Sequence, residues 1–228
     1  MYVDCVKERQ TSAMSDSISN MPATPMTLRI GDEAPDFTAR STKGQISLSA
    51  LRGRWVIFFS HPADFTPVCT SEFVAFSRAA PDFEACGATL IGLSIDSLPS
   101  HLAWIDAIRT QMDVRIPFPV IEDPSMAIAR AYGMLDSQAR DSATVRATYI
   151  LDPDGIIQAI FWYPMTVGRA VSEILRTLRA LQRVAPGDAL TPEGWQPGNP
   201  VLSPGILSQD AMPGDNAPWF HQLRNDAP

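Results

Sequence analysis

Cysteine is scarce in this chain of 228 residues, which has only Cys5, Cys69 and Cys86. The number is odd, no two of them are spaced as Cys-x-x-Cys, and they do not fall among histidines in the pattern of a zinc site. Neither a disulfide scaffold nor a structural metal is therefore expected. A reducing cytoplasmic compartment fits this usage best.

Long apolar runs and an excess of positive charge are also missing. No run approaches the roughly 20 residues that span a bilayer. The chain carries 18 basic and 25 acidic residues, for a formal net charge of −7. Because an acidic surface attracts neither nucleic acids nor anionic lipids, we expect a soluble protein that has no nucleic-acid or membrane partner.

The first 27 residues have no continuous apolar core of signal-peptide length, and their acidic residues do not suit a transit peptide. Ser, Thr, Met and Pro dominate without periodicity, so we expect residues 1–27 to form a flexible leader that contains Cys5.

Strand and helix patterns alternate through residues 28–184. Apolar runs predict strands at residues 55–59, 89–95 and 118–121, and residues 144–163 predict a hairpin that turns at Asp152-Pro153-Asp154-Gly155. Helical spacing follows Cys69 up to Gly87, with Pro81 expected to kink or interrupt it, and recurs after Ser97, at 125–132 and at 168–184. The sum is a mixed α/β sandwich, in which a central sheet is covered by helices and a hairpin lies at one side.

Residues 185–228 differ in composition, with many prolines spaced among glycines. Regular secondary structure should be scarce there. The apolar residues of this arm are too many for a solvated tail, so we expect the arm to dock onto a second subunit. These apolar residues are Trp195, Val201, Leu202, Ile206, Leu207, Trp219 and Phe220.

Cys69 lies at a strand-to-helix junction, after the apolar run at 55–59 and directly before a helical pattern. A cysteine in the first turn of a helix lies among unpaired N–H groups at the positive end of the helix dipole, which favour the thiolate. A thiolate there is a nucleophile, and Thr66, three residues earlier, is placed for its hydroxyl to face the sulfur. Pro62 and Pro67 fix the loop and offer no N–H to the sulfur.

The segment Pro62-x-x-x-Thr66-x-x-Cys69 resembles the active-site motif of the peroxiredoxins, and its flanks, Phe-Ser-His-Pro-x-Asp-Phe-Thr-Pro-Val-Cys-Thr, resemble the one-cysteine subfamily. The resemblance covers roughly residue 28 to the end. It implies a thioredoxin-like fold and a homodimer with a C-terminal arm. It also implies a cofactor-free, metal-free peroxidase that reduces hydrogen peroxide and alkyl hydroperoxides through a sulfenic acid.

The same resemblance implies roles for further residues. Arg146 is similar in place to the arginine that pairs with the thiolate and the peroxide, and Arg169 to a second arginine that supports it. His61 is either a base for the thiol or a packing or interface residue. Glu72 is either a helix cap or the family's recurrent acid, and an alternative or additional role of Thr66 is that of the N-cap of the helix.

Recycling of the oxidised cysteine depends on the two other cysteines. Cys86 is expected to be a small buried apolar residue, and no cysteine follows Arg169, which favours a one-cysteine cycle with glutathione, glutaredoxin or thioredoxin as the external reductant. A dithiol oxidoreductase is disfavoured because Thr66 stands where Cys-x-x-Cys would place the second thiol. An oxidation-triggered redox sensor or holdase chaperone that uses the same cysteine stays open.

Overall fold

A computed structural model describes residues 27–135, 143–206, 208, 210, 212 and 218–226, so the predicted leader and Cys5 lie outside the described residues. A seven-stranded sheet has the order β2-β1-β5-β4-β3-β6-β7. Its strands are β1 (Thr38–Ser41), β2 (Gly44–Ser47), β3 (Trp55–Ser60), β4 (Ala88–Ser94), β5 (Val120–Glu122), β6 (Arg146–Leu151) and β7 (Ile157–Tyr163). The helices of the described residues are η1 (Ser49–Leu51), α1 (Pro67–Ala85), α2 (Leu98–Met112), α3 (Ala127–Ala131) and α4 (Val171–Val184).

The centre of the sheet consists of β3, β4 and β6, whose residues are almost all buried. β3 and β4 pair in parallel and are joined through α1, whereas β6 pairs antiparallel with β3 and forms the predicted hairpin with β7. Such continuous apolar strands require cover on both faces. Gly92 in β4 allows close packing, because a Cβ there would lie 3.4 Å from the ring of Phe73 and 3.5 Å from that of Phe59.

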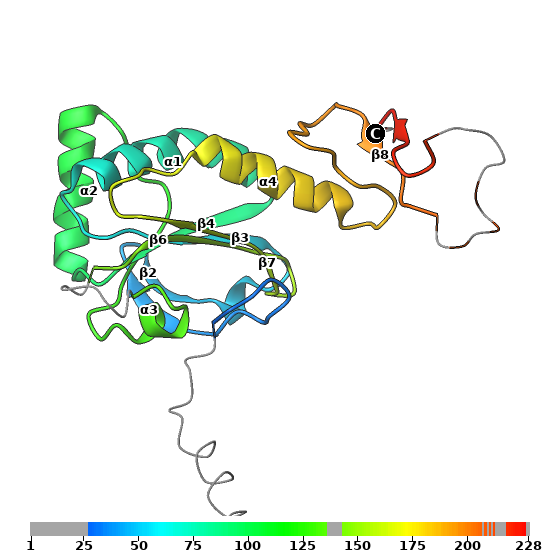
Figure 1. The fold of residues 1–228 in the computed structure, drawn as a ribbon. Helices are drawn as coiled ribbons and strands as arrows, with labels where there is room; N and C mark the ends of the chain where they lie inside the picture. Colours follow the sequence, from blue (N-terminus) through cyan, green and yellow to red (C-terminus); the bar gives the residue numbers. More distant parts are fainter. Residues whose placement is uncertain are drawn as a thin grey trace, which may run out of the picture.

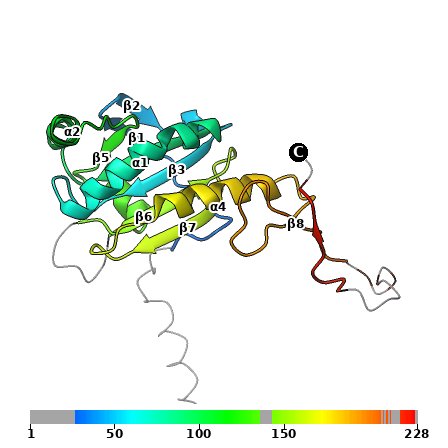
Figure 2. The same ribbon diagram turned by 90° about the horizontal axis from the view of Figure 1, so that it is seen from above.

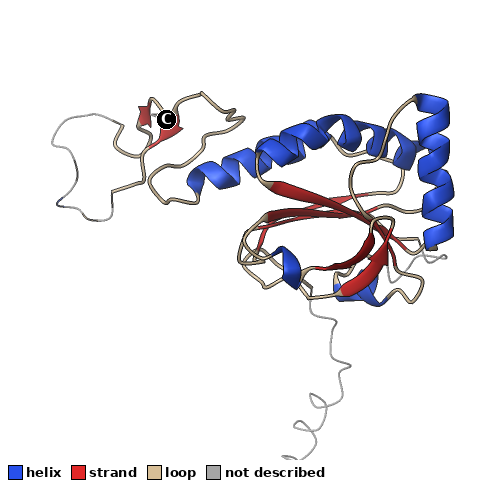
Figure 3. Cartoon of the chain, turned by 180° about the vertical axis from the view of Figure 1, so that it is seen from behind, coloured by secondary structure: helices blue, strands red, loops and turns tan. Residues whose placement is uncertain are grey.

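Helices lie on both faces of the sheet (Figures 1 and 2), and an apolar cluster packs against each face. One lies under α1, α2 and α4, and the other lies on the opposite face beside α3. The predicted α/β sandwich is therefore confirmed. Figure 3 shows the same arrangement from behind, with α1 and α4 along one face of the sheet and the C-terminal arm beyond the end of α4.

Two predicted boundaries were wrong, for identifiable reasons. The strand predicted at 118–121 begins at Val120, because Pro119 has no N–H to donate to a ladder. The helix predicted at 125–132 is only Ala127–Ala131, because Met126 is in the left-handed region with φ 58°. The carboxylate of Asp123 accepts the N–H groups of Ala127 and Ala129 and so takes over the start of this helix.

The predicted interruption of α1 at Pro81 was also wrong, since α1 is one continuous helix from Pro67 to Ala85. Pro81 lies on the exposed side of the helix. The carbonyl that loses its partner there can therefore be hydrated. The end of α1 agrees with the sequence, because Gly87 has φ 65° and its N–H donates to the carbonyl of Glu84.

The arm after α4 has little regular structure in its described part, namely β8 (Val201–Leu202) paired with β9 (Leu223–Arg224). Trp195 is 3% exposed and packs in a small cluster with Ala180 of α4, Ala189 and Val201, so it is docked on its own chain. Phe220 stays 74% exposed. The described part of the arm thus has a buried anchor around Trp195 and several exposed apolar residues, among them Leu190, Phe220 and Leu223.

Candidate active site

Cys69 occupies the first turn of α1, as the sequence predicts, and it is completely buried. The first N–H of the helix that bonds within it is that of Thr70, which donates to the Thr66 carbonyl at 2.9 Å. The N–H groups of Val68 and Cys69 precede this bond, and Pro67 has none. Two backbone donors therefore remain at the helix start for an anionic or peroxide oxygen.

Arg146, the first residue of β6, is 2% exposed and lies against the thiol. Its Nη1 lies 3.4 Å from the Sγ of Cys69. The same nitrogen donates to Glu72 at 2.7 Å, while Nε and Nη2 both donate to the carbonyl of Met165, at 2.9 and 2.7 Å. This rigid fork holds a permanent positive charge beside the sulfur.

Glu72 lies one turn after Cys69 and joins the two predicted arginines. Its carboxylate accepts Arg146 Nη1 on Oε2, and accepts the backbone N–H, Nε and Nη2 of Arg169 at 2.7, 2.9 and 2.7 Å. Glu72 is therefore the buried acid of the site and not a helix cap. α4 begins at Val171 and not at the predicted residue 168, because Ala170 is extended, with φ −79° and ψ 100°.

Arg169 supports this network without a described contact to the sulfur. Its Nη1 donates to the Ala147 carbonyl at 2.9 Å and to the Thr148 hydroxyl at 3.2 Å. Its guanidinium carbon lies 5.2 Å from the centre of the Phe59 ring. Arg169 thus fixes Glu72 and, through it, Arg146.

The charges of this buried network favour a thiolate. Arg146 and Arg169 contribute two positive charges and Glu72 one negative charge, all on side chains at most 2% exposed. The three residues together have a net charge of +1. Since an uncompensated buried charge is costly, a thiolate at Cys69 neutralises the group and is stabilised by it.

Thr66 occupies the N-cap position of α1, but its side chain does not cap the helix. Its hydroxyl donates to the Ala63 carbonyl at 2.8 Å, which leaves the lone pairs of the oxygen free to accept. Pro62 is buried in the same loop. Phe65, directly before Thr66, has φ 54°, an uncommon conformation for a residue with a side chain, and it is 60% exposed.

His61 is not bonded to Cys69 but to Asp64, at 2.9 Å from Nε2 to Oδ1. Asp64 also faces Nδ1 of His101, at 2.8 Å from Oδ2. Burial lowers the pKa of His61, and the hydrogen bond that His61 donates to Asp64 only partly opposes this. His61 is therefore a neutral member of a buried cluster, and the predicted alternative of a base for the thiol has no supporting contact.

This cluster is the one group in the described ranges with the composition of a metal site, since its donor atoms lie within 4.8 Å of one another. The three side chains form hydrogen bonds with one another, however, and His101 also bonds to the backbone carbonyl of Ile121.

Sequence reasoning missed Asp64, His101 and the carbonyl of Met165. Asp64 lies inside the motif around Cys69, so the sequence could have indicated it as a site residue. The other two lie far from Cys69 in the chain.

The ion-pair network predicts a pH-dependent stability. Burial alone would raise the pKa of Glu72, but the hydrogen bonds and charge of Arg169, with the charge of Arg146, outweigh burial and lower the pKa. A carboxyl with a lowered folded-state pKa contributes stability that is present above its unfolded value, about 4.3, and is lost as the pH falls through the folded value. Glu72→Gln should therefore reduce the free energy of unfolding by about 3 kcal/mol at pH 7.

The difference between the wild type and Glu72→Gln should shrink as the pH falls below about 4.3, as measured by urea unfolding from pH 7 to pH 3. Glu173→Gln is the matched control, because Glu173 pairs with Arg176 on the surface, with side chains 43% and 22% exposed. It should cost less than about 1 kcal/mol. Equal costs for the two variants would contradict a stabilising role of the buried network.

A buried thiol at a helix N-terminus beside an arginine, on an α/β sheet with helices on both faces, defines a thiol-dependent oxidoreductase. Comparison with known proteins agrees. The AhpC/TSA family matches residues 30–160, more than half of the chain. Peroxiredoxin 2 of Caldanaerobacter subterraneus subsp. tengcongensis is 47% identical over 190 residues, which are 83% of this chain and 86% of that protein.

Two solved structures are similar over most of the chain. A mutant of peroxiredoxin 6 of Arenicola marina has a TM-score of 0.74 and 35% identity, and the match covers 80% of this chain and 86% of that one. A yeast mitochondrial 1-Cys peroxiredoxin has a TM-score of 0.74 and 41% identity, with 81% and 90% covered. The fold is thioredoxin-like, as predicted. The chain belongs to the AhpC/TSA family and is a peroxiredoxin, a thiol-dependent peroxidase.

Within the parts of the chain that the structure describes, no helix combines the length and the apolar character needed to cross a membrane.

Proposed function

We propose that Cys69 is the peroxidatic cysteine and that the protein reduces hydrogen peroxide and alkyl hydroperoxides. The thiolate attacks one peroxide oxygen, so that an S–O bond forms while the O–O bond breaks. The sulfur is oxidised to a sulfenic acid, and the departing oxygen takes a proton and leaves as water or an alcohol. The observation that carries this proposal is the distance of 3.4 Å between the sulfur of Cys69, at the start of α1, and Nη1 of Arg146.

Each step of the attack has a suitable group nearby. Arg146 stabilises the thiolate before the attack and the negative charge on the departing oxygen after it. The free N–H groups of Val68 and Cys69 and the lone pairs of Thr66 are placed to orient a peroxide. Pro62 fixes the loop, and Arg169 and Glu72 hold Arg146 in place.

We propose further that the cycle uses one cysteine and an external thiol, with glutathione, glutaredoxin or thioredoxin as candidate donors. Cys86 lies at the opposite end of α1, 17 residues from Cys69, which is about 25 Å at the helical rise. A disulfide needs Cα atoms within about 7 Å. The yeast mitochondrial 1-Cys peroxiredoxin is described as having a thiol-resolving mechanism via glutathione/thioredoxin systems, which supports this proposal.

The domain organisation that we propose is a leader at 1–27, a peroxidase domain at 28–184 and an arm at 185–228 that contacts a second copy of the chain. The exposed apolar residues of the arm support the contact, since Phe220 and Leu223 are 74% and 55% exposed.

Peroxide consumption by the wild type and by a Cys5/Cys86 double serine variant tests the one-cysteine cycle, with dithiothreitol as donor. Both proteins should turn over at the same rate within about twofold, because an external thiol resolves Cys69 in each. Mass spectrometry with a sulfenic-acid trap should find the modification on Cys69.

The result that would overturn the one-cysteine cycle is an internal disulfide in the oxidised wild type together with stalled turnover in the double variant. Such a result would assign the resolving role to Cys5 or Cys86. It would leave Cys69 as the site of attack.

A further inference from the structure

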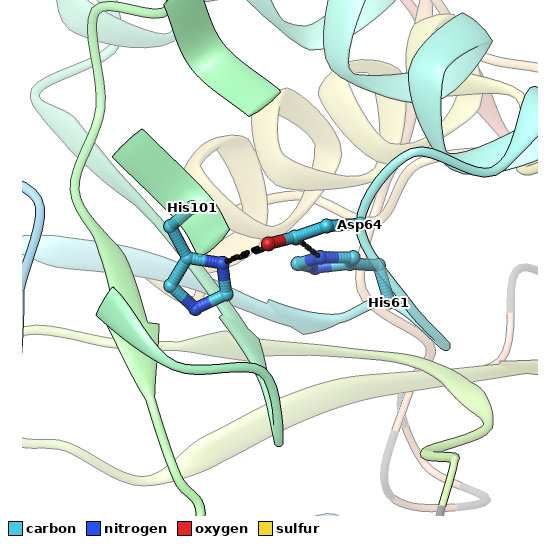
Figure 4. A group of neighbouring side chains, drawn as sticks. All are labelled: His61, Asp64 and His101. Atoms are coloured by element: carbon cyan, nitrogen blue, oxygen red, sulfur yellow. Dashed lines mark hydrogen bonds and ion pairs between the residues drawn. The ribbon is translucent and has the colours of Figure 1, made fainter. Parts of the chain in front are cut away.

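His61, Asp64 and His101 form a buried cluster (Figure 4), and two of them belong to the loop that leads to Cys69. Their side chains are 0%, 1% and 0% exposed. His61 directly follows β3, Asp64 lies in the loop before α1, and His101 lies in α2. The cluster therefore joins the loop of the active site to a helix that carries none of the residues of the proposed chemistry.

The hydrogen bonds determine where the protons of this cluster lie. Nε2 of His101 lies 3.1 Å from the Ile121 carbonyl, which can only accept, so this nitrogen carries a proton. Nδ1 of His101 faces both oxygens of Asp64, at 2.8 and 3.0 Å. Burial alone would raise the pKa of Asp64, but the hydrogen bonds from His101 and His61 outweigh it and lower the pKa. The Asp64 carboxylate is therefore an acceptor, and His101 carries a proton on both nitrogens.

His61 completes the pattern as a neutral ring. Its Nε2 donates to Asp64, and its buried Nδ1 has no hydrogen-bond partner in the structure. A second proton on that nitrogen would bury an unpaired charged donor, which is costly. The cluster thus contains one imidazolium, one carboxylate and one neutral imidazole, with a net charge of zero.

This arrangement acts on the position of Cys69, which lies five residues after Asp64. The backbone N–H of Asp64 also donates to Asp96, at 3.1 Å, so the loop is bound through both its side chain and its main chain. Asp96 in turn accepts the hydroxyl of Ser94 at the end of β4. The loop is therefore tied to α2 through His101, to β5 through the Ile121 carbonyl and to β4 through Asp96.

The proposed cycle requires this loop to move. Cys69 is 0% exposed, yet its sulfenic acid must come within bonding distance, about 2.05 Å, of the sulfur of an external thiol. The loop and the first turn of α1 must open for that step and close again for the reaction with peroxide.

We propose that the Asp64–His101 pair is a clamp that positions Cys69 for the reaction with peroxide and sets how readily the loop opens for its reduction. The inference rests on the proposed function of Cys69. His101 is accordingly a positioning residue, because it acts through Asp64 and does not touch the sulfur.

The strength of the clamp depends on both hydrogen bonds of His101, because a ring that bonds to only one of Asp64 and Ile121 holds the loop less firmly. Two acidic groups lie near the cluster. Asp96 is on the loop between β4 and α2, and Glu122 accepts the N–H of Leu98 at the start of α2 and pairs with Arg40 at 2.8 Å. α1 and α2 contribute the rings of Phe73 and Trp104.

The test measures the two half-reactions separately in the full chain: sulfenic acid formation with hydrogen peroxide, and its reduction by glutathione, both followed by rapid quenching and mass spectrometry. His101→Gln keeps the volume and one donor group but carries no charge. We expect it to raise the ratio of the reduction rate to the peroxide rate by at least about fivefold, because a hydrogen bond to a charged group is lost.

Opposite changes in the two half-reactions separate a clamp from a merely structural residue. A weakened clamp should slow the reaction with peroxide and speed the reduction, whereas a general loss of folded protein would lower both rates. His221→Gln is the matched control, because His221 is exposed on the arm, and its ratio should equal that of the wild type.

An unchanged or lowered ratio in His101→Gln, or a parallel loss of both rates, would overturn the clamp while Cys69 still forms sulfenic acid in the wild type. Absence of sulfenic acid in the wild type would instead contradict the proposed function. If His101→Gln does not fold, Asp64→Asn gives the same test, because it removes the charge at equal volume.

Discussion

Replacing Cys69 by serine is expected to abolish thiol-dependent peroxide consumption, with a loss of at least about 1,000-fold. Serine keeps the shape of the buried side chain, but its hydroxyl stays un-ionised at neutral pH and is a poor nucleophile toward an O–O bond. The net charge of +1 on Arg146, Arg169 and Glu72 also loses the anion that it stabilises in the wild type. Peroxide consumption with dithiothreitol as donor measures this effect.

Cys86→Ser is the matched control, because it makes the same chemical change at a partly buried cysteine at the far end of α1. Its activity should stay within about twofold of the wild type. Circular dichroism should show that both variants are folded. Turnover by Cys69→Ser at the rate of the wild type would refute the assignment of the nucleophile.

Arg146→Ala is expected to lower the second-order rate constant for peroxide by about 100- to 1,000-fold, the usual cost of removing a donor that stabilises developing charge. Arg146 makes contacts with the Cys69 sulfur, with Glu72 and with the Met165 carbonyl at the same time. Arg146→Lys should recover little of the rate, because one ammonium group cannot reproduce this fork. Stopped-flow measurement of the peroxide reaction gives the rate constants.

Loss of stability is a competing explanation for a slow Arg146→Ala variant, because Glu72 loses one of its two partners. Thermal unfolding should show that the protein is folded at the assay temperature, and Glu72 keeps its pair with Arg169. Arg109→Ala, which removes an exposed arginine paired with Asp106, should leave the rate unchanged. A peroxide rate within threefold of the wild type in Arg146→Ala would reduce Arg146 to a structural residue.

Much of the fold followed from local pattern. The buried strands β3 and β4 are apolar on both faces, and the hairpin turn at Asp152-Pro153-Asp154-Gly155 has its own signature. The errors occurred where a local rule met a tertiary contact. α4 starts late because Ala170 is extended, after Arg169 has bound Glu72 through its backbone and side chain, and α3 is short because Asp123 caps it from outside.

The candidate site divides in the same way. Thr66 and Cys69 are near in sequence, so their approach at the start of one helix was predictable. The role of Glu72 stayed open because its partner is distant in the chain. His61 bonds to the nearby Asp64, but the cluster that they form is completed only by a residue of α2. Arg169 lies 97 residues after Glu72, and His101 lies 37 residues after Asp64.

The sequence by itself determined that this protein has a thiol at a strand-to-helix junction and an α/β sheet to carry it, because both are set by contiguous residues with local preferences. Only the tertiary structure decided what surrounds that thiol. β6 brings Arg146 to Cys69, the segment before α4 brings Arg169 to Glu72, and α2 brings His101 to Asp64. The physical reason is that buried charges must pair, and in a chain wound around one sheet their partners come from strands and helices far apart in sequence.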